Sequence, residues 1–130
     1  MKPAEGEMID EGENYQLYKI KNYLRKVYCI ESDTILSAQT IFENLYIKWQ
    51  CNQTEEPLMN IVCSYEDGIW YTFIFPRAAF RPWQYTAEGD RQLMVSPATV
   101  ELSGIFITPI ESHFNRITKE NVQSILEQCS

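Results

Sequence analysis

Three polar residues in the middle of the sequence have the chemistry of a phosphate-binding site: Asn60, Arg77 and Arg81. An arginine guanidinium donates paired hydrogen bonds that match phosphate oxygens, and an asparagine amide can both donate and accept. Aromatic rings provide stacking surfaces for bases. Such rings are interleaved with the two arginines at Phe80, Trp83 and Tyr85. These residue types predict a small cationic pocket lined by aromatic side chains.

A β-hairpin is predicted to position two of these residues. Asp67-Gly68 separates two β-rich runs, 60–66 and 69–75. Asp-Gly favours a two-residue hairpin loop because glycine accepts a positive φ. Residue 66 then pairs with residue 69 and Asn60 pairs with Phe75, so Asn60 lies at the hairpin end from which Arg77 continues. Both faces of the hairpin are largely apolar, which predicts a central place in a sheet covered on both sides.

When residue types alone are considered, a structural role for the two arginines is favoured over phosphate binding. Both could pair with acids or with backbone carbonyls and fix the long connection 76–92. Glu88 and Glu101 form a second tier of acids that a site at a loop edge could use. An isolated carboxylate is more commonly a solvated surface group.

No residues are predicted to be catalytic or to bind a metal. His113 is the only histidine, and a lone histidine is more often a surface or capping residue than a catalyst. The four cysteines have no C-x-x-C spacing, so zinc and redox motifs are unsupported, and neither glycine-rich phosphate-binding motif is present. We therefore expect no cofactor and a reduced, cytoplasmic protein with buried thiols.

The charge of the chain excludes a generally basic nucleic-acid binder. The 130 residues carry a net charge of −7, of which −4 belongs to residues 1–14. This acidic leader is predicted to be a flexible tail, followed by a single domain over residues 15–130. The longest apolar stretch, 69–75, is too short to cross a membrane, and the N-terminus lacks the features of a signal peptide. We expect neither a nucleic acid nor a membrane as partner.

Hydrophobic periodicity predicts an α+β fold with a mainly antiparallel sheet and flanking helices. Residues 15–31 alternate in a way that favours strands. Apolar residues from Ile35 to Trp49 recur at helical spacing, and Ser32 or Asp33 is predicted to cap this helix.

The C-terminal part of the sequence is predicted to contain strands and helices in alternation. Segments 93–95 and 104–108 favour short strands, and Ser96-Pro97 between them favours the start of a brief helix. Thr118 is predicted to cap a final helix with an apolar face.

Several short segments occur in an order that is moderately specific. They are Pro-Leu-Met-Asn-Ile-Val at 57–62, Phe-Pro-Arg at 75–77, Val-Ser-Pro at 95–97 and Gly-Ile-Phe-Ile-Thr-Pro at 104–109. This set resembles the C-terminal domain of ATP adenylyltransferase-like nucleotide phosphorylases. That family includes diadenosine tetraphosphate and GDP-hexose phosphorylases and belongs to the histidine-triad superfamily. A Phe-Pro-Arg-x-x-x-Arg-Pro stretch at 75–82 and Ala-Glu-Gly at 87–89 are most similar to uncharacterised bacterial members.

The resemblance, which covers residues 15–128, implies a histidine-triad-like half of a nucleotidyltransferase or phosphorylase acting on nucleoside di- or polyphosphates. It implies that Asn60 contacts nucleotide and that Arg77 and Arg81 lie near the active-site cleft. In such enzymes a His-x-His-x-His/Gln motif in the N-terminal half supplies the nucleophile. This sequence has no such motif, and His113 does not lie in one.

The implied partners are a nucleotide or nucleotide-sugar and a histidine-bearing N-terminal half, in cis or in trans. A fragment, a split subunit, a degenerate relative and a homodimer all stay open. The alternative function is a non-catalytic module that binds nucleotide or protein. A third hypothesis is a purely structural role.

Overall fold

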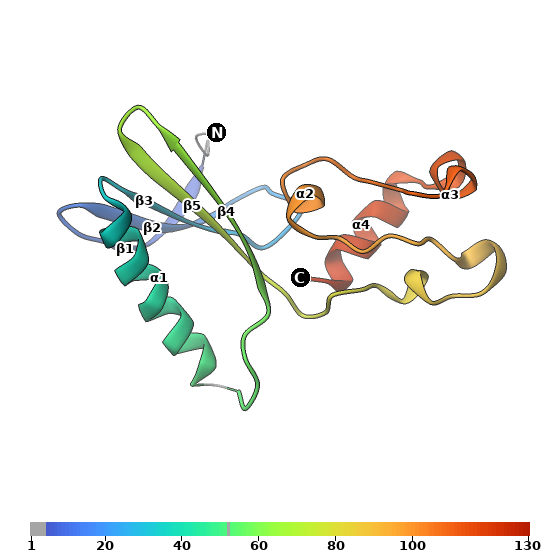
Figure 1. Cartoon of the computed structure of the whole chain (residues 1–130), viewed down its shortest axis with the longest axis horizontal. Helices are drawn as coiled ribbons and strands as arrows, with labels where there is room; N and C mark the ends of the chain where they lie inside the picture. Colours follow the sequence, from blue (N-terminus) through green and yellow to red (C-terminus); the bar gives the residue numbers. More distant parts are fainter. Residues whose placement is uncertain (1–4, 52) are drawn as a thin grey trace. The chain divides into compact units, whose positions relative to one another are not determined.

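The computed structural model describes residues 5–51 and 53–130, whose strands and helices form the predicted α+β fold (Figure 1). Within these residues five strands form one antiparallel sheet in the order β1-β2-β3-β5-β4. The strands are β1 (Gly6–Glu11), β2 (Tyr15–Ile20), β3 (Tyr28–Ser32), β4 (Met59–Glu66) and β5 (Ile69–Pro76). The helices are α1 (Ile35–Gln50), α2 (Thr99–Leu102), α3 (Glu111–Arg116) and α4 (Lys119–Gln128), with 3-10 turns η1 (Trp83–Tyr85) and η2 (Gly89–Arg91).

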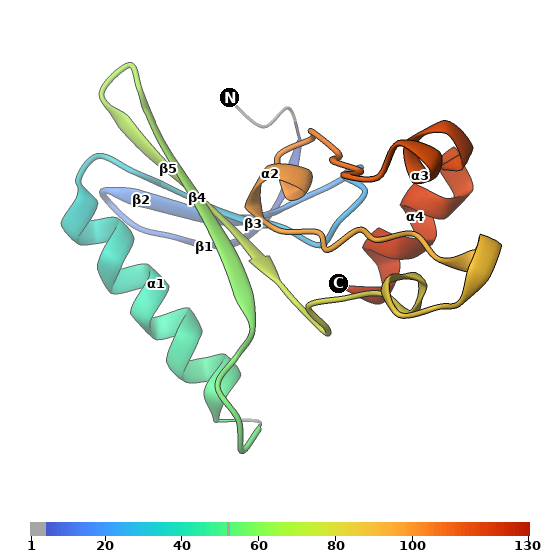
Figure 2. The same cartoon turned by 45° about the vertical axis from the view of Figure 1, so that its right-hand side comes forward.

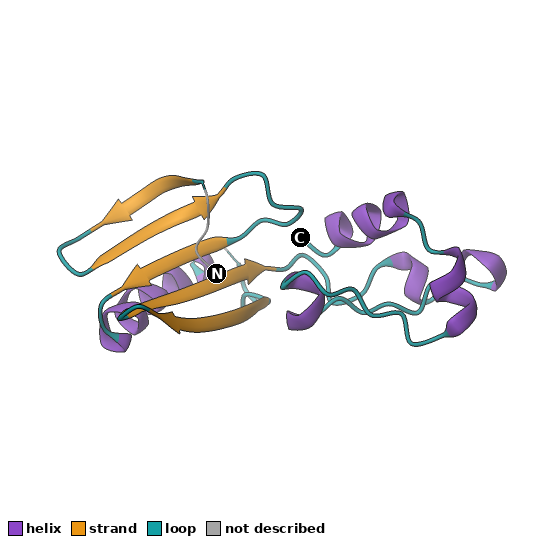
Figure 3. Ribbon diagram, turned by 90° about the horizontal axis from the view of Figure 1, so that it is seen from above, coloured by secondary structure: helices purple, strands orange, loops and turns teal. Residues whose placement is uncertain are grey.

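The described residues fall into two compact units, and the single domain over residues 15–130 stays a prediction. The first ends at Pro76, and the second runs from Arg77 to Ser130. The first unit holds the sheet and α1, whereas the described part of the second consists of helices and connecting segments (Figure 3). Among the described residues, no strand after Pro76 joins the sheet. The second unit instead has an apolar cluster of its own.

The β4–β5 hairpin has the predicted register. Glu66 pairs with Ile69 and Asn60 pairs with Phe75 across the Asp67-Gly68 loop (Figure 2). Both loop residues have a positive φ, 52° and 82°, as a two-residue hairpin turn requires. The predicted central position is correct for β5, which lies between β3 and β4, but wrong for β4, which is an edge strand.

Helix α1 packs on one face of the sheet. Its buried side chains recur at helical spacing, and they contact buried residues of three strands (Figure 1). The cap differs from the prediction by one or two residues, because Thr34 accepts the hydrogen bond from the Ser37 N–H at 3.2 Å. The cluster comprises Ala38, Ile41 and Leu45 of α1 with Leu17, Ile30 and Ile74 of the strands.

Strand β1 replaces most of the predicted flexible tail. Gly6–Glu11 pair with β2 although all six residues are exposed, so ladder hydrogen bonds rather than apolar burial hold the strand. Gly6 lies against the Tyr18 ring, where an added Cβ would be 2.3 Å from Tyr18 Cδ2. Residues 1–4 of the predicted tail lie outside the described residues.

The two strands predicted in the second unit are absent from its described secondary structure. Segments 93–95 and 104–108 are irregular. Leu93 and Val95 are buried, but they pack with Ile125 of α4 rather than in a sheet. The short apolar run Leu-Met-Val therefore marks an extended segment that packs on a helix, where we had predicted a strand of the sheet.

The helices of the second unit agree only in part with the prediction. Thr118 caps α4 as predicted: its Oγ1 accepts from the Asn121 N–H at 3.2 Å, and Asn121 Oδ1 accepts from the Thr118 N–H at 3.0 Å. Helix α2 begins at Thr99, with Ala98 rather than Ser96 as its N-cap. Helix α3 was not predicted. Among the described residues, no helix is both long and apolar enough to cross a membrane.

Candidate functional site

Arg77 is a buried residue that organises the loop containing it. Its Nη2 donates to the carbonyl oxygens of Phe80, at 2.9 Å, and Ala79, at 3.1 Å. Its Cζ lies 5.5 Å from the centroid of the Phe80 ring. These contacts are the loop-fixing role that residue types alone favoured for an arginine here.

Arg81 differs from Arg77 because its side chain is exposed. Its Cζ lies 4.3 Å from the centroid of the Tyr85 ring, a cation–π distance. An exposed guanidinium that lies over an aromatic ring still has N–H donors that suit phosphate oxygens. Phe80 and Trp83, 57% and 54% exposed, are further aromatic surfaces on this loop. We call residues 77–85 the Arg81 loop.

Helix α4 holds the Arg81 loop in place. The Ala78 N–H donates to the Cys129 carbonyl oxygen at 3.2 Å. The Trp83 N–H donates to Oε1 of Gln128 at 2.9 Å, and Nε2 of Gln128 donates to Oε1 of the buried Gln84 at 3.0 Å. A loop anchored at several points presents its exposed side chains with little loss of conformational entropy on binding.

Asn60 lies in the other compact unit. It is half-buried at the beginning of β4, opposite Phe75, as the hairpin register predicts. The structure brings Arg77 and Arg81 together on one loop, whereas Asn60 belongs to the sheet.

The two acids of the second tier have different surroundings. Glu88 is exposed and directly precedes η2. Glu101 is half-buried, and its Oε2 accepts a hydrogen bond from the Ala98 N–H at 2.8 Å. That contact satisfies a backbone donor before the first turn of α2, so Glu101 has a structural role at this helix end.

His113 is buried, where we expected a surface or capping residue. Its Nδ1 accepts a hydrogen bond from the Met94 N–H at 3.0 Å. A neutral imidazole that accepts at Nδ1 carries its proton on Nε2. The side chain therefore joins α3 to the segment before α2, a role that its isolated position in the sequence did not indicate.

A hollow in the second unit brings together donors that sequence reasoning missed. It has a volume of about 230 Å³ and includes Arg91, Arg116 and Asn121 in its lining, with Trp83 and Leu93 as apolar walls. We call it the Arg116 hollow. Its residues come from η1, η2, α3, α4 and the irregular segment after η2, and no spacing in the sequence links them.

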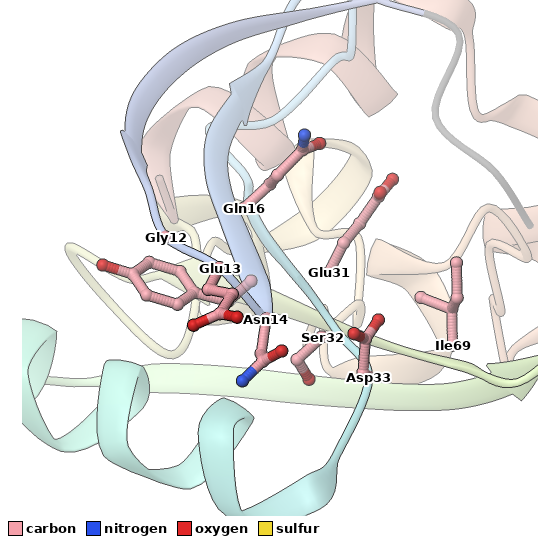
Figure 4. A pocket seen from close by; sticks show the side chains of 9 residues that line it. Gly12, Glu13, Asn14, Gln16, Glu31, Ser32, Asp33 and Ile69 are labelled. Carbon is pink, nitrogen blue, oxygen red and sulfur yellow. The ribbon is translucent and has the colours of Figure 1, made fainter.

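A second hollow, in the first unit, is acidic. Its volume is about 220 Å³, and Figure 4 shows Glu13, Glu31 and Asp33 among its side chains. Three carboxylates disfavour a phosphate ligand. Within residues 5–51 and 53–130, no three His, Cys, Asp or Glu side chains are grouped so that they could hold a metal ion.

Two ionisable groups on the sheet, the Tyr18 hydroxyl and the Cys29 thiol, are buried near this hollow. The Tyr18 hydroxyl donates to Oε1 of Glu31 at 2.6 Å. Burial and its hydrogen bonds with Cys29 and Glu31 raise the pKa of Tyr18 above its usual range. Burial raises the pKa of the Cys29 thiol to about 12. Both groups stay protonated at neutral pH, so neither serves as a nucleophile there.

Comparison with known proteins yields one match, at the level of a family. No curated protein and no solved structure matches the chain. The family described as GDPGP1-like, C-terminal domain, matches residues 2–130, which is nearly the whole sequence. The match agrees with the resemblance to GDP-hexose phosphorylases. The chain belongs to the GDPGP1-like C-terminal domain family, the C-terminal domain of a GDP-hexose phosphorylase-like protein.

Proposed function

We propose that this chain is the non-nucleophile half of a histidine-triad-type nucleotidyltransferase or phosphorylase that acts on nucleoside di- or polyphosphates. The observation that carries the proposal is the Arg81 loop. There an exposed guanidinium, stacked on Tyr85, lies on a segment fixed by Arg77 and by Gln128. A preorganised cation beside exposed aromatic rings suits a phosphate attached to a base.

The residues of this half bind and orient a substrate in the proposal. Arg81 neutralises phosphate charge, and Arg77 sets the loop conformation from which Arg81 projects. Asn60, by resemblance to the family, hydrogen-bonds the nucleotide. A second polypeptide segment with a His-x-His-x-His motif, in cis or in trans, would supply the nucleophile, because His113 is buried and accepts a backbone hydrogen bond.

The cellular setting is part of the proposal. All four cysteines are free thiols, two buried and two exposed. Free thiols persist in a reducing compartment, so we infer a cytoplasmic location. We infer a bacterial source from the resemblance at residues 75–82.

A titration with a nucleoside diphosphate, followed by amide chemical shifts, tests the binding role. We expect shifts in residues 77–85 of the 130-residue chain, and we expect Arg81→Gln to weaken binding about tenfold, as loss of a charge-assisted hydrogen bond does. Lys21→Gln, which removes an exposed positive charge from the first unit, is the control and should change little. Unchanged affinity in Arg81→Gln would contradict the proposal.

The missing nucleophile is tested by a phosphorolysis assay. The chain alone should show no turnover, and mixing with a histidine-bearing half should restore it. Turnover by the isolated chain that survives His113→Ala would refute the proposal.

A non-catalytic nucleotide- or protein-binding module is the second candidate, and the burial of the single histidine favours it. This candidate predicts the same nucleotide binding at the Arg81 loop. It also predicts that no histidine-bearing half restores turnover, which distinguishes it from the first proposal.

A further inference from the structure

The Arg116 hollow lies entirely within the second unit and does not include Arg81 in its lining. Two guanidinium groups contribute to it, with Asp90 as the acid of the same lining, so the lining has a net charge of about +1 from these side chains. Its volume of about 230 Å³ is small for a whole nucleotide, since pockets for drug-sized ligands occupy about 300–1,000 Å³. Charge and size together favour a small anion.

Arg116 is held in a fixed position at this hollow. Its Nη1 donates to the carbonyl oxygen of Asp90, and its Nη2 donates to the carbonyl oxygen of Gln92. A guanidinium has five N–H donors, so three donors and the full positive charge remain after these two bonds. Carbonyl partners orient the group without neutralising it as a carboxylate would.

Asn121 presents donors to the hollow rather than acceptors. Its Oδ1 accepts from the Thr118 N–H at 3.0 Å, which fixes the orientation of the amide at the start of α4. The Nδ2 group, on the other side of the amide carbon, therefore retains two N–H donors. The adjacent first turn of α4 adds the positive end of the helix dipole.

Trp83 supplies an aromatic wall, and a hydrogen bond from its backbone N–H to Gln128 fixes the backbone at this position. Trp83 as a whole is 54% exposed. Cationic groups, amide donors and a flat apolar wall match the two parts of a phosphomonoester: a charged phosphate and an attached ring.

We propose that the Arg116 hollow is a separate site for a phosphate group, either inorganic phosphate or the phosphate of a small phosphomonoester. Arg116, Arg91 and the Asn121 amide bind the oxygens, and Trp83 covers the group that carries the phosphate. The site shares Trp83 with the Arg81 loop, but its phosphate-binding groups, Arg91, Arg116 and Asn121, lie outside that loop, so it does not depend on Arg81.

Titration of the full chain with inorganic phosphate and with phenyl phosphate tests this site, with phenol as the uncharged probe. We expect both phosphates to shift the side-chain amide of Asn121 and the indole N–H of Trp83, and phenol to shift neither. Phenyl phosphate should bind more tightly than inorganic phosphate, and Trp83→Leu should remove that advantage. Equal binding of both phosphates with Trp83 in place identifies inorganic phosphate as the ligand.

Asn121→Asp is the decisive variant. An aspartate keeps the acceptor for the Thr118 N–H and suits a helix N-terminus, so α4 stays capped, but the amide donors are lost and a negative charge is added. Phosphate affinity should fall at least about tenfold in Asn121→Asp and several-fold in Arg91→Gln. Asp90→Asn should raise affinity, because the acid of the lining becomes neutral while its backbone carbonyl is unchanged.

Two further variants are controls. Lys119→Gln removes a charge from the same helix outside the hollow lining and should change phosphate affinity by less than about twofold. Arg81→Gln should leave the phosphate shifts at Asn121 unchanged, even where it weakens nucleotide binding. The proposal is overturned by absence of shifts at Trp83 and Asn121, or by equal phosphate affinity in the parent, Asn121→Asp and Arg91→Gln. Loss of phosphate binding in Arg81→Gln would show that the two sites are not separate.

Discussion

Gln128 accepts a hydrogen bond at its Oε1 from the backbone N–H of Trp83, at 2.9 Å. The same amide donates through Nε2 to Oε1 of Gln84, at 3.0 Å, and to the carbonyl oxygen of Ser124, at 3.2 Å. One side chain in the last turn of α4 thus uses both ends of its amide to fix the Arg81 loop. The exposed side chains of the loop are positioned because Gln128, which is distant in sequence, accepts a hydrogen bond from the loop backbone.

Replacing this amide should destabilise the second unit. Gln128→Leu leaves the Trp83 N–H and the buried Gln84 amide without their Gln128 partner, which costs about 1–3 kcal/mol per buried group. Amide hydrogen exchange at residues 83 and 84 should accelerate. Gln123→Leu, on the exposed side of the same helix, is the control and should change stability by no more than about 0.5 kcal/mol. Equal exchange rates in the two variants would contradict the anchoring role.

His113 should be needed for stability rather than for catalysis. His113→Phe keeps an aromatic ring but removes the acceptor for the Met94 N–H, so we expect a loss of about 1–3 kcal/mol in the free energy of unfolding. Urea denaturation measures the loss. Phe114→Ser, at the next and exposed position, should have a small effect. A His113→Phe protein of unchanged stability would show that this hydrogen bond contributes nothing.

Gly6→Ala tests whether the acidic N-terminal segment is a strand. The added Cβ would meet the Tyr18 ring at 2.3 Å, and Tyr18 is buried, so either the ring or the strand must move. We expect faster amide exchange over residues 6–11, while the amides of β3 and β5 remain protected. If residues 6–11 exchange at the rate of an unstructured chain in the parent protein, the strand is absent in solution.

The buried thiol of Cys29 should make the protein sensitive to alkaline pH. Its pKa is about 12 in the folded chain against an ordinary 9.0, so the unfolded state releases this proton at lower pH than the folded state. Stability is therefore unaffected below pH 9 and falls as the pH rises toward 12, by a total on the order of 4 kcal/mol from this group. Tyr18, whose pKa is also raised, adds to the fall.

Urea denaturation across this pH range measures the effect, and Cys29→Ala isolates the part due to the thiol. The variant should lose stability less steeply above pH 9 than the parent protein. Identical slopes would mean that the thiol ionises as readily in the folded chain as in the unfolded one.

The register of the hairpin could be predicted because local chemistry determines it. Asp67 and Gly68 both adopt a positive φ in the structure, and that requirement is visible in the sequence. Once the loop is fixed, every pair back to Asn60 and Phe75 follows by counting. The edge position of β4 could not be predicted in this way, because strand order depends on which partner β5 pairs with on its other side.

Several predictions failed because they depended on burial, which is set by tertiary packing. The apolar run 93–95 is buried at Leu93 and Val95, but an extended segment packed against Ile125 of α4 needs the same apolar residues as a strand of a sheet. Strand β1 has no apolar face at all, so its sequence contains no signal of burial. The remaining signal is a pair of glycines, Gly6 in the strand and Gly12 directly after it, which both lie against tyrosine rings of β2.

Parts of the candidate site could be predicted because they depend on local spacing in the sequence, as the hairpin register does. Arg77 and Arg81 are neighbours in sequence, so their shared loop follows from spacing. Their different roles do not, since burial of one and exposure of the other arise from how the loop folds on itself. The Arg116 hollow joins side chains from four separate elements, and only the three-dimensional structure brings them together.

The hydrogen bond from the Ala78 N–H to the Cys129 carbonyl oxygen joins the second residue of the second unit to its second-last. The first and last residues of this unit therefore lie close together in space. A circular permutant could therefore join these two positions through a short linker and have its new ends in an exposed turn, such as the one at Gly104.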